Sequence, residues 1–194
     1  TRPKSSAASD VYKRQIAGTL RKTKKINHNK ALAFFRRNEK ETKEHNMIVD
    51  MERNDLSKIC KTGSVKIDKL KTVEEYRDLF HYVTTIKGVL KNKITNHDII
   101  SSLMPGGSVI GCPKISTIQL LNKKEKSDRN IYTGSFGIIH SNGDMRFNIM
   151  IRTLLNFKNA IELSVASGVI LGSTAKKEYN ENYIKAKSLL DLFN

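Results

Sequence analysis

The dipeptide Asn142-Gly143 lies between two apolar stretches, residues 131–140 and 144–155. Asn-Gly between two such stretches is the strongest local signal for a β-hairpin, because both central residues of a type I′ turn need a positive φ. We therefore expect two antiparallel strands joined by a type I′ turn. Antiparallel pairing at this point is the strongest constraint that the sequence places on the fold.

Periodicity along the rest of the chain predicts further strands and helices. Residues 65–73 alternate apolar and polar side chains, and residues 79–90 are rich in β-branched and aromatic ones, so both stretches are predicted strands. Antiparallel strands flanked by helices indicate an α+β fold, with antiparallel sheets and outer helices. A further strand is predicted at 161–171, and helices are predicted at 29–58, 96–103, 113–123 and 175–193.

Two of the predicted helices have a recognisable apolar face. The first helix also carries polar residues beside its apolar face, at Asp50, Arg53, Asn54 and Asp55. The apolar residues expected to face the core are Met47, Ile48, Met51 and Leu56 in the first helix, and Tyr179, Tyr183, Ala186, Leu189 and Leu190 in the last.

Residues 1–15 have no hydrophobic periodicity and few apolar side chains. They resemble a non-native leader, such as translated library or adapter sequence, and a disordered terminus is the alternative. We therefore expect the folded domain to comprise residues 16–194.

The chain has 35 Lys and Arg residues against 19 Asp and Glu, a formal net charge of +16. The Lys residues are scattered and are not interleaved with aromatic ones, which argues against a nucleic-acid partner. A basic surface also attracts small anions, including dicarboxylic acids. Because the sequence shows neither a membrane-length apolar run nor a secretory signal, we expect a cytoplasmic protein without a membrane partner. Cys60 and Cys112 lack the spacing of a zinc site or a disulfide framework.

Two pairs of acids have the spacing of neighbours on a helix face. Glu41 and Glu44 are three residues apart in one predicted helix, and Glu178 and Glu181 are three apart in another, with Lys185 on the same face. Carboxylates that converge on one point favour a hard cation such as Mg²⁺. Solvated salt-bridge faces are the alternative, and spacing alone does not decide between the two.

Other residues have both a chemical and a structural interpretation. The stretch Pro105-Gly106-Gly107-Ser108 is a candidate cradle for a phosphate or carboxylate, or a simple turn. Gly168 indicates either a ligand close to the backbone or a bulge. The guanidinium of Arg152 suits a carboxylate, although a surface ion pair is the commoner role. Tyr132 and His81 lie in predicted strands, where packing is the simplest role for each.

Six motifs follow one another from Ile16 to the C-terminal region. They are IAGTLRK (16–22), EHNMIVDMERNDLSKICKTGSVKI (44–67), PGGSVIGCPK (105–114), YTGSFGIIHSNGDM (132–145), NIMIRTLL (148–155) and EYNENYIKAKSLL (178–190). In this order they resemble the chorismate-utilising enzymes, which include the large component of anthranilate synthase, component I of aminodeoxychorismate synthase, and the isochorismate and salicylate synthases. The resemblance implies the α+β sandwich of that family, of which this chain would be the C-terminal part.

The resemblance also implies a set of site residues. His81 and Thr19 match catalytic-site residues that line the substrate ring. Asp50, Arg53, Asn54 and Asp55 are then expected to be a polar scaffold. The acids Glu41, Glu44, Glu178 and Glu181 match those that hold Mg²⁺, directly or through water, and the substrate-binding residues are matched by Tyr132 and Arg152 (enolpyruvyl carboxylate), Lys185 (ring carboxylate) and Gly168 (backbone contact).

The activity implied is Mg²⁺-dependent amination of chorismate, with ammonia from a glutamine amidotransferase subunit or domain. Residues 105–108 and 151–154 look more like aminodeoxychorismate synthase, which makes 4-amino-4-deoxychorismate on the folate and p-aminobenzoate route. Ala17 disfavours the subset of those enzymes that places a nucleophilic lysine there. Anthranilate synthase, which also expels pyruvate, is the alternative. A non-catalytic anion- or nucleic-acid-binding fragment is a more distant one.

The sequence departs from the family pattern at several positions. Gln15 stands where the family usually has Pro, and Ala166-Ser167 replaces a glycine pair. The general-acid glutamate of the family lies upstream, in a Ser-Pro-Glu stretch without a counterpart here. We therefore expect the chain to be part of a longer enzyme and to be inactive by itself.

Overall fold

The computed structural model describes residues 10–77, 79–169 and 172–193, apart from the side chains of residues 17, 40, 41 and 188. The chain divides into two units, Thr1–Pro113 and Lys114–Asn194. The first unit holds β1 (Asp10–Arg21), α1 (His28–Arg37), α2 (Glu39–Ile59), β2 (Lys66–Glu75), β3 (Leu79–Val89), α3 (Asn96–Leu103) and α4 (Gly107–Ile110). The second holds α5 (Lys114–Lys124), β4 (Ser135–Ile139), β5 (Met145–Ile149), β6 (Leu154–Phe157), β7 (Ala160–Leu163), α6 (Ala175–Leu190) and a short 3₁₀ helix (Asp191–Phe193).

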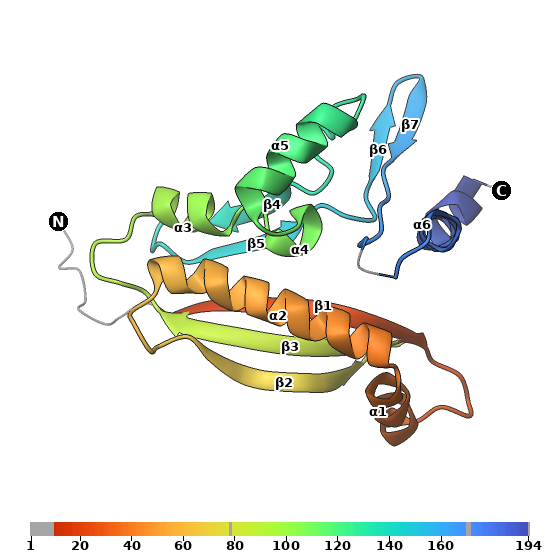
Figure 1. The fold of residues 1–194 in the computed structure, drawn as a ribbon, viewed down its shortest axis with the longest axis horizontal. Coiled ribbons are helices and arrows are strands. Elements are labelled where there is room, and N and C mark those ends of the chain that lie inside the picture. Colours follow the sequence, from red (N-terminus) through yellow and green to blue (C-terminus); the bar gives the residue numbers. More distant parts are fainter. Residues whose placement is uncertain (1–9, 78, 170–171, 194) are drawn as a thin grey trace. The chain divides into compact units, whose positions relative to one another are not determined.

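The first unit is built on an antiparallel sheet in the order β1-β3-β2. Helix α2 contacts β1 and β3 and lies along the sheet, and α3 and α4 pack against the same helix (Figure 1). Strand β3 is central, and its residues are buried from Tyr82 to Ile86. The predicted strands 65–73 and 79–90 and the predicted helix 96–103 are therefore confirmed.

Strand β1 begins upstream of the expected domain start. Asp10 pairs with Val89 and Gln15 pairs with Thr84 on the neighbouring strand. The prediction that residues 1–15 lie outside the fold is wrong for 10–15, because polar side chains on an edge strand hide a pairing that depends on main-chain hydrogen bonds. Residues 1–9 lie outside the described part of the chain.

The predicted helix 29–58 is two helices. Asn27 caps α1, because its side-chain oxygen accepts a hydrogen bond of 3.0 Å from the main-chain N–H of Lys30. Asn38 then leaves the helical region at φ −83° and ψ 95°, and α2 begins at the next residue. Its main-chain carbonyl accepts a hydrogen bond of 3.0 Å from the amide of Thr42, and Asn is a residue type that favours helix ends over helix interiors.

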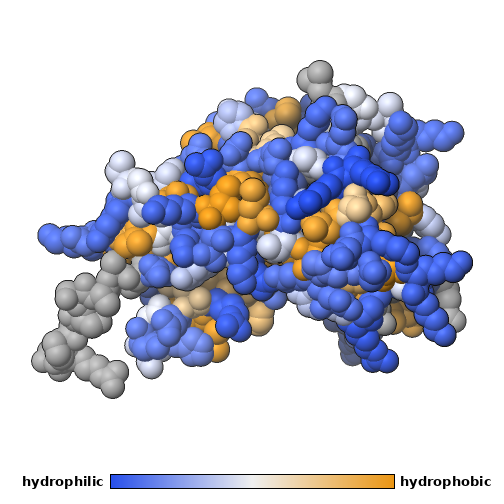
Figure 2. All heavy atoms as spheres, turned by 90° about the horizontal axis from the view of Figure 1, so that it is seen from below, coloured by the Kyte–Doolittle hydropathy of each residue, from blue (hydrophilic) through white to orange (hydrophobic). Residues whose placement is uncertain are grey.

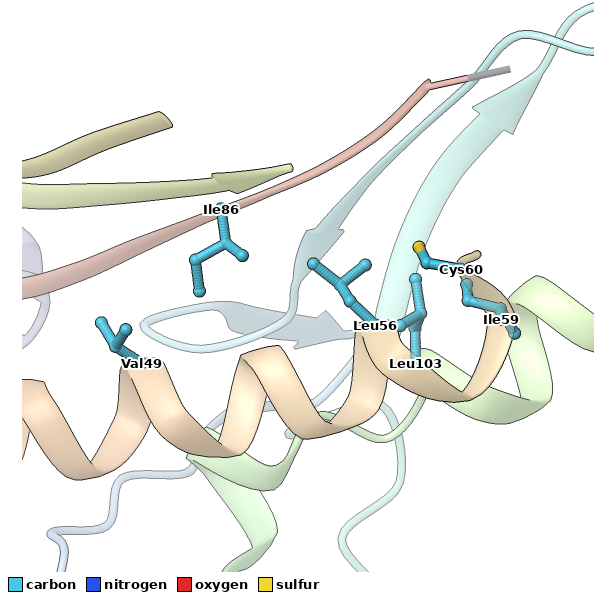
Figure 3. Packing of buried hydrophobic residues seen from close by; sticks show 6 residues of the cluster. All are labelled: Val49, Leu56, Ile59, Cys60, Ile86 and Leu103. Carbon is cyan, nitrogen blue, oxygen red and sulfur yellow. The ribbon is translucent and has the colours of Figure 1, made fainter. Parts of the chain in front are cut away.

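Helix α2 buries one face against the sheet and α3. Leu56 is completely buried in a cluster that includes Val49, Ile59 and Ile86 and is joined by Leu103 from α3 (Figure 3). Burying one such side chain stabilises the fold by roughly 1.5–3 kcal/mol. The predicted face is wrong at Met47, which is 46% exposed.

A second cluster fixes α1 to the other end of the sheet. Ala31 and Phe35 of α1 pack against Val73, Phe80 and Tyr82. The rings of Phe35 and Tyr82 are stacked, with centroids 4.9 Å apart and an interplanar angle of 11°. The clusters at the two ends of the sheet therefore hold α1 and α2 on it.

The predicted hairpin is present as β4 and β5, but its turn type differs. Ile139 pairs with Met145, and the amide of Gly143 donates to the carbonyl of His140 at 2.9 Å. Within residues 141–143, Gly143 alone has a positive φ, 93°. The loop therefore matches a three-residue hairpin with glycine in the left-handed position, and the predicted type I′ turn is wrong. The side chain of Asn142 accepts from the amide of Asp144 at 3.0 Å instead.

The stretch 144–155 forms two strands instead of one. Arg152 has a positive φ of 52°, which breaks the extended chain between β5 and β6. Strand β6 then pairs with β7, so that Leu154 lies opposite Leu163. The strand predicted at 161–171 is correspondingly short: residues 164–169 form no regular structure, and 170–171 lie outside the described residues.

Helix α6 confirms the predicted helix at 175–193 up to Leu190. Ala186 is buried as predicted, but the rest of the buried face differs, because Glu178 is buried while Tyr179 and Tyr183 are exposed. Leu190 is also exposed, and Leu189 is partly buried. The prediction counted the tyrosines as apolar and placed them toward the core. In the structure, the buried position in the first turn of this helix is occupied by the carboxylate of Glu178.

The surface is largely hydrophilic on the face drawn in Figure 2, with separate hydrophobic patches between the polar residues. None of the helices in the described part of the chain combines the length and apolar composition that crossing a bilayer requires.

Candidate functional site

Thr19 and His81 lie opposite each other on β1 and β3. The hydroxyl oxygen of Thr19 is 3.0 Å from Nδ1 of His81, and the ring of Tyr76 meets the imidazole edge-on with centroids 5.3 Å apart. A register shift between Ile16 and Gly18 precedes this pair, so the bulge sets which residues face each other. The two predicted catalytic residues, 62 positions apart in the sequence, are thus in hydrogen-bonding contact.

Lys185 connects α6 to the segment that contains Gly168. Its ammonium lies 2.8 Å from a carboxylate oxygen of Glu181 and donates to the carbonyl of Ala166 at 3.2 Å. Gly168 is exposed, and a Cβ placed on it would have no neighbouring atom within 4 Å. Three of the predicted site residues therefore gather at one place in the second unit, beside an open stretch of backbone.

Glu178 is buried at the start of α6. Its Oε1 accepts a hydrogen bond of 2.7 Å from the hydroxyl of Ser173. Sequence reasoning missed Ser173, because it lies five residues before Glu178 and the pair lacks the three-residue spacing of a capping box. A buried carboxylate needs such hydrogen bonds or a cation for compensation.

The other predicted metal ligands lie in the first unit. Glu44 is partly buried in α2, whereas the side chain of Glu41 is outside what the structure describes. Among the described side chains, no three His, Cys, Asp or Glu residues come close enough together to hold a metal ion. Because the two acid pairs belong to different units, their convergence on one cation stays a prediction.

Tyr132 lies in the turn before β4, so its predicted place in a strand is wrong. Burial raises the pKa of its hydroxyl. The guanidinium of Arg129 lies 5.9 Å from the centre of its ring and is held in turn by Glu125, with Nε 2.8 Å from a carboxylate oxygen. Arg129 therefore fixes the position of the tyrosine ring.

Arg152 is exposed on the strained turn between β5 and β6. A small hollow next to this turn is lined by Tyr132, Thr153 and five other residues. The structure thus places Tyr132 and the residue after Arg152 at the same hollow, although it records no contact between the tyrosine and the arginine. A non-glycine residue at positive φ costs about 1–3 kcal/mol, and such strain is found preferentially at functional sites.

The polar residues of α2 have mainly structural roles. His45 is completely buried, with Nε2 2.6 Å from the hydroxyl of Thr84, and burial, reinforced by the charge of Lys71, lowers its pKa to about 4. Asp55 is buried between Lys13 and Lys58, at 3.7 and 3.2 Å. These contacts attach α2 to the sheet, which is the scaffold role expected for Asp55.

The remaining members of the expected scaffold are exposed. Arg53 and Asp50 form a solvent-facing pair at 3.4 Å, and Asn54 is also exposed. Sequence reasoning also missed Glu52, which is buried and forms an ion pair with Lys13.

The Gly-rich stretch at 105–108 has a packing role. Gly107 opens α4 and is buried, and a Cβ placed there would lie 3.1 Å from Cε of Met51. Glycine therefore allows α4 to approach α2 closely. This packing role was not among the two predicted interpretations, an anion cradle or a simple turn.

Comparison with known proteins defines the class to which this arrangement belongs. A family model described as chorismate binding enzyme matches residues 5–191. The crystal structure of anthranilate synthase component I from Streptococcus pneumoniae superposes with a TM-score of 0.74 at 35% identity, covering 92% of this chain and 39% of that one. The α+β fold expected from the sequence is confirmed.

Curated relatives agree with the structural comparison. The chain is 38% identical to aminodeoxychorismate synthase component 1 of Bacillus subtilis over 174 residues, which is 89% of this chain and 37% of the relative. It is also 38% identical over 178 residues to the anthranilate synthase component I-like protein of Synechocystis, covering 91% of this chain and 37% of that protein. The chain therefore belongs to the chorismate binding enzyme family, and it spans little more than a third of the length of these relatives.

Proposed function

We propose that the chain is the chorismate-binding part of an enzyme that aminates chorismate to 4-amino-4-deoxychorismate. The observation that carries this proposal is the 38% identity to aminodeoxychorismate synthase component 1 across 89% of the chain. The contact between Thr19 and His81 supports it, because two residues expected to line the substrate ring lie side by side. Glutamine is the proposed source of ammonia, through an amidotransferase subunit or domain.

Thr19 and His81 would act on the ring of the substrate. The hydroxyl of Thr19 engages Nδ1 and so fixes the orientation of the imidazole. Nε2 is then the ring atom that gives or takes a proton at the substrate, since the tautomer of a histidine is set by the partner of its other nitrogen. Tyr76, packed edge-on against the ring, restricts its rotation.

The carboxylates of the substrate would be bound by cations and hydroxyls of the second unit. The ammonium of Lys185 donates to the carbonyl of Ala166, two residues before Gly168, and so lies near this exposed stretch of backbone. Tyr132 and Arg152 would bind the second carboxylate, for which the fork of the guanidinium is well suited. Because Arg152 is exposed, the N–H donors of its guanidinium are accessible to a ligand.

The acids present fit Mg²⁺, since all four predicted ligands are carboxylates and hard cations prefer oxygen donors. Glu178 and Glu181 would hold the ion from α6, and Glu41 and Glu44 from α2. When bound, Mg²⁺ offsets the negative charge of the substrate and orients it. Ser173, which donates to Glu178, would keep that carboxylate in position.

Anthranilate synthase is the second candidate, because the structure from Streptococcus pneumoniae bears that name and matches 92% of the chain. Product analysis separates the two reactions. The full-length protein would be incubated with chorismate, Mg²⁺ and ammonia, and the products separated by chromatography. We expect 4-amino-4-deoxychorismate without pyruvate; release of pyruvate without an added lyase would replace our assignment with anthranilate synthase.

A further inference from the structure

The segment around α1 has an unusual charge. Residues 16–38 contain no Asp or Glu, whereas Lys and Arg recur along the whole stretch. The next part of the chain, 39–58, mixes acidic and basic residues instead. The excess of positive charge is therefore concentrated in residues 16–38 and is not spread evenly along this part of the chain.

The outer face of α1 forms a shallow, open hollow whose surface is mainly apolar. It is lined by Lys30, Ala33, Phe34, Arg37 and Asn38. Lys30, Ala33, Phe34 and Arg37 are exposed, whereas Ala31 and Phe35 of the same helix are completely buried against the sheet. The hollow thus combines an exposed aromatic ring with a cation on either side.

Two side chains of this face, Phe34 and Lys30, have contacts that restrict their positions. Phe34 is 45% exposed, and its ring packs edge-on against Phe35 with centroids 5.6 Å apart. The ammonium of Lys30 donates to the carbonyl of Lys25 at 3.0 Å. Within the described residues, neither Lys30 nor Arg37 forms an ion pair with a carboxylate. A surface ordered in advance loses less entropy on binding, and unpaired cations favour an acidic partner.

The hollow lies on an element that also contacts the neighbours of the catalytic pair. Helix α1 packs against Phe80 and Leu20, which are adjacent in sequence to His81 and Thr19. A protein bound to α1 would therefore sit at the same end of the sheet as the proposed site of amination.

We propose that the face of α1 formed by Lys30, Ala33, Phe34 and Arg37 docks an acidic segment of the ammonia-supplying partner, with an apolar side chain of that segment against Phe34. The inference rests on the proposed function, which requires such a partner. Binding of a nucleic acid is disfavoured, because single strands are held by successive aromatic rings and this face offers one.

The test uses the full-length protein, its amidotransferase partner and the charge-reversal variant K30E/R37E. The affinity between the two proteins is measured by calorimetry, and product formation is measured with glutamine and, separately, with ammonia. We expect the dissociation constant to rise roughly tenfold or more, and glutamine-dependent activity to fall with it at limiting partner, because opposite charges at an interface become like charges. Activity with ammonia should stay unchanged, which also shows that the variant is folded.

A matched control is K123E/K124E, which reverses two exposed charges at the end of α5 and should change neither activity nor affinity. F34A should weaken partner binding without changing charge. Unchanged affinity in both K30E/R37E and F34A would overturn the proposal, as would a loss of DNA binding in place of partner binding. If the wild-type protein makes no aminated product from either nitrogen source, the proposed function fails, while the calorimetric comparison still decides the docking surface.

Discussion

The two units of the chain bury apolar side chains to very different extents. In the first unit, residues of α2 and α3 pack with Ile86 in one buried cluster that includes Leu56. Phe35 of α1 packs with Phe80 in a second buried cluster. In the second, Ile115 and Phe136 are about three-quarters exposed (75% and 73%), and Val169 is 80% exposed. The first unit thus has two clusters of its own, whereas the second leaves these three large apolar side chains exposed.

This difference indicates a division of roles between the units. Substitutions in the clusters of the first unit should reduce the free energy of unfolding. Substitutions at the proposed binding residues of the second unit should change ligand affinity and leave stability nearly unchanged. The predictions that follow test this division, in order of expected size.

Leu56→Ala should lower the free energy of unfolding by about 2–5 kcal/mol, because it removes a completely buried side chain from the packed cluster. Chemical denaturation of wild type and variant measures the difference. Met47→Ala on the same helix and Phe136→Ala in the second unit are controls, since both side chains are exposed. An equal loss in Phe136→Ala would contradict the proposed division.

Acid should destabilise the first unit through His45. Its pKa is lowered to about 4 in the folded state, against about 6.5 when unfolded, so folding favours the neutral ring. The stability from this group is complete above pH 6.5 and is lost as the pH falls from 6.5 to 4. The full effect is about 3 kcal/mol as an order of magnitude. His45→Gln should flatten the pH dependence of unfolding in this range, and an unaltered slope would rule out this origin.

Gly88→Ala should destabilise the protein by about 1–3 kcal/mol, because the added Cβ would lie 2.6 Å from the sulfur of Cys60. Combining it with Cys60→Ala should cost less than the sum of the two single substitutions. Gly168→Ala is the matched comparison, since its Cβ would have no neighbour within 4 Å. It should leave the melting temperature unchanged and weaken chorismate binding by the full-length protein. A similar loss of stability in both glycine variants would show that the contact with Cys60 is not the cause.

The sequence predicts elements with strong periodicity better than it predicts the site. Alternation and β-branched residues locate β2 and β3, which pair with each other from one end of β2 to the other with two register shifts between. Arg152 is different: nothing in a run of apolar residues indicates a positive φ, so one predicted strand is two. The buried face of α6 is missed for a similar reason, since a glutamate rather than a tyrosine takes the inner position.

Resemblance identified candidate site residues, but it did not predict which of them contact one another. Sequence spacing says nothing about the contact of Thr19 with His81, which depends on the bulge in β1. The link from Lys185 to Ala166 likewise depends on how the segment after β7 returns to α6. The role of Ser173 was missed because resemblance concerned the carboxylates and not the groups that hold them.

Ser173→Ala should have the smallest effect on stability, about 1 kcal/mol, because it removes one hydrogen bond to a buried carboxylate. Its effect on the proposed metal site should be clearer. Residues that orient a ligand typically change metal affinity by roughly 10- to 100-fold, and Mn²⁺ binding to the full-length protein, followed by electron paramagnetic resonance, measures this without turnover. Ser141→Ala in the exposed β4–β5 turn is the control and should change neither quantity. If Ser173→Ala binds Mn²⁺ as tightly as wild type while Glu178→Gln does not, Glu178 is positioned without the serine hydroxyl. If neither substitution changes Mn²⁺ binding, α6 does not supply metal ligands, and the second unit would then bind chorismate through Lys185, Tyr132 and Arg152 alone.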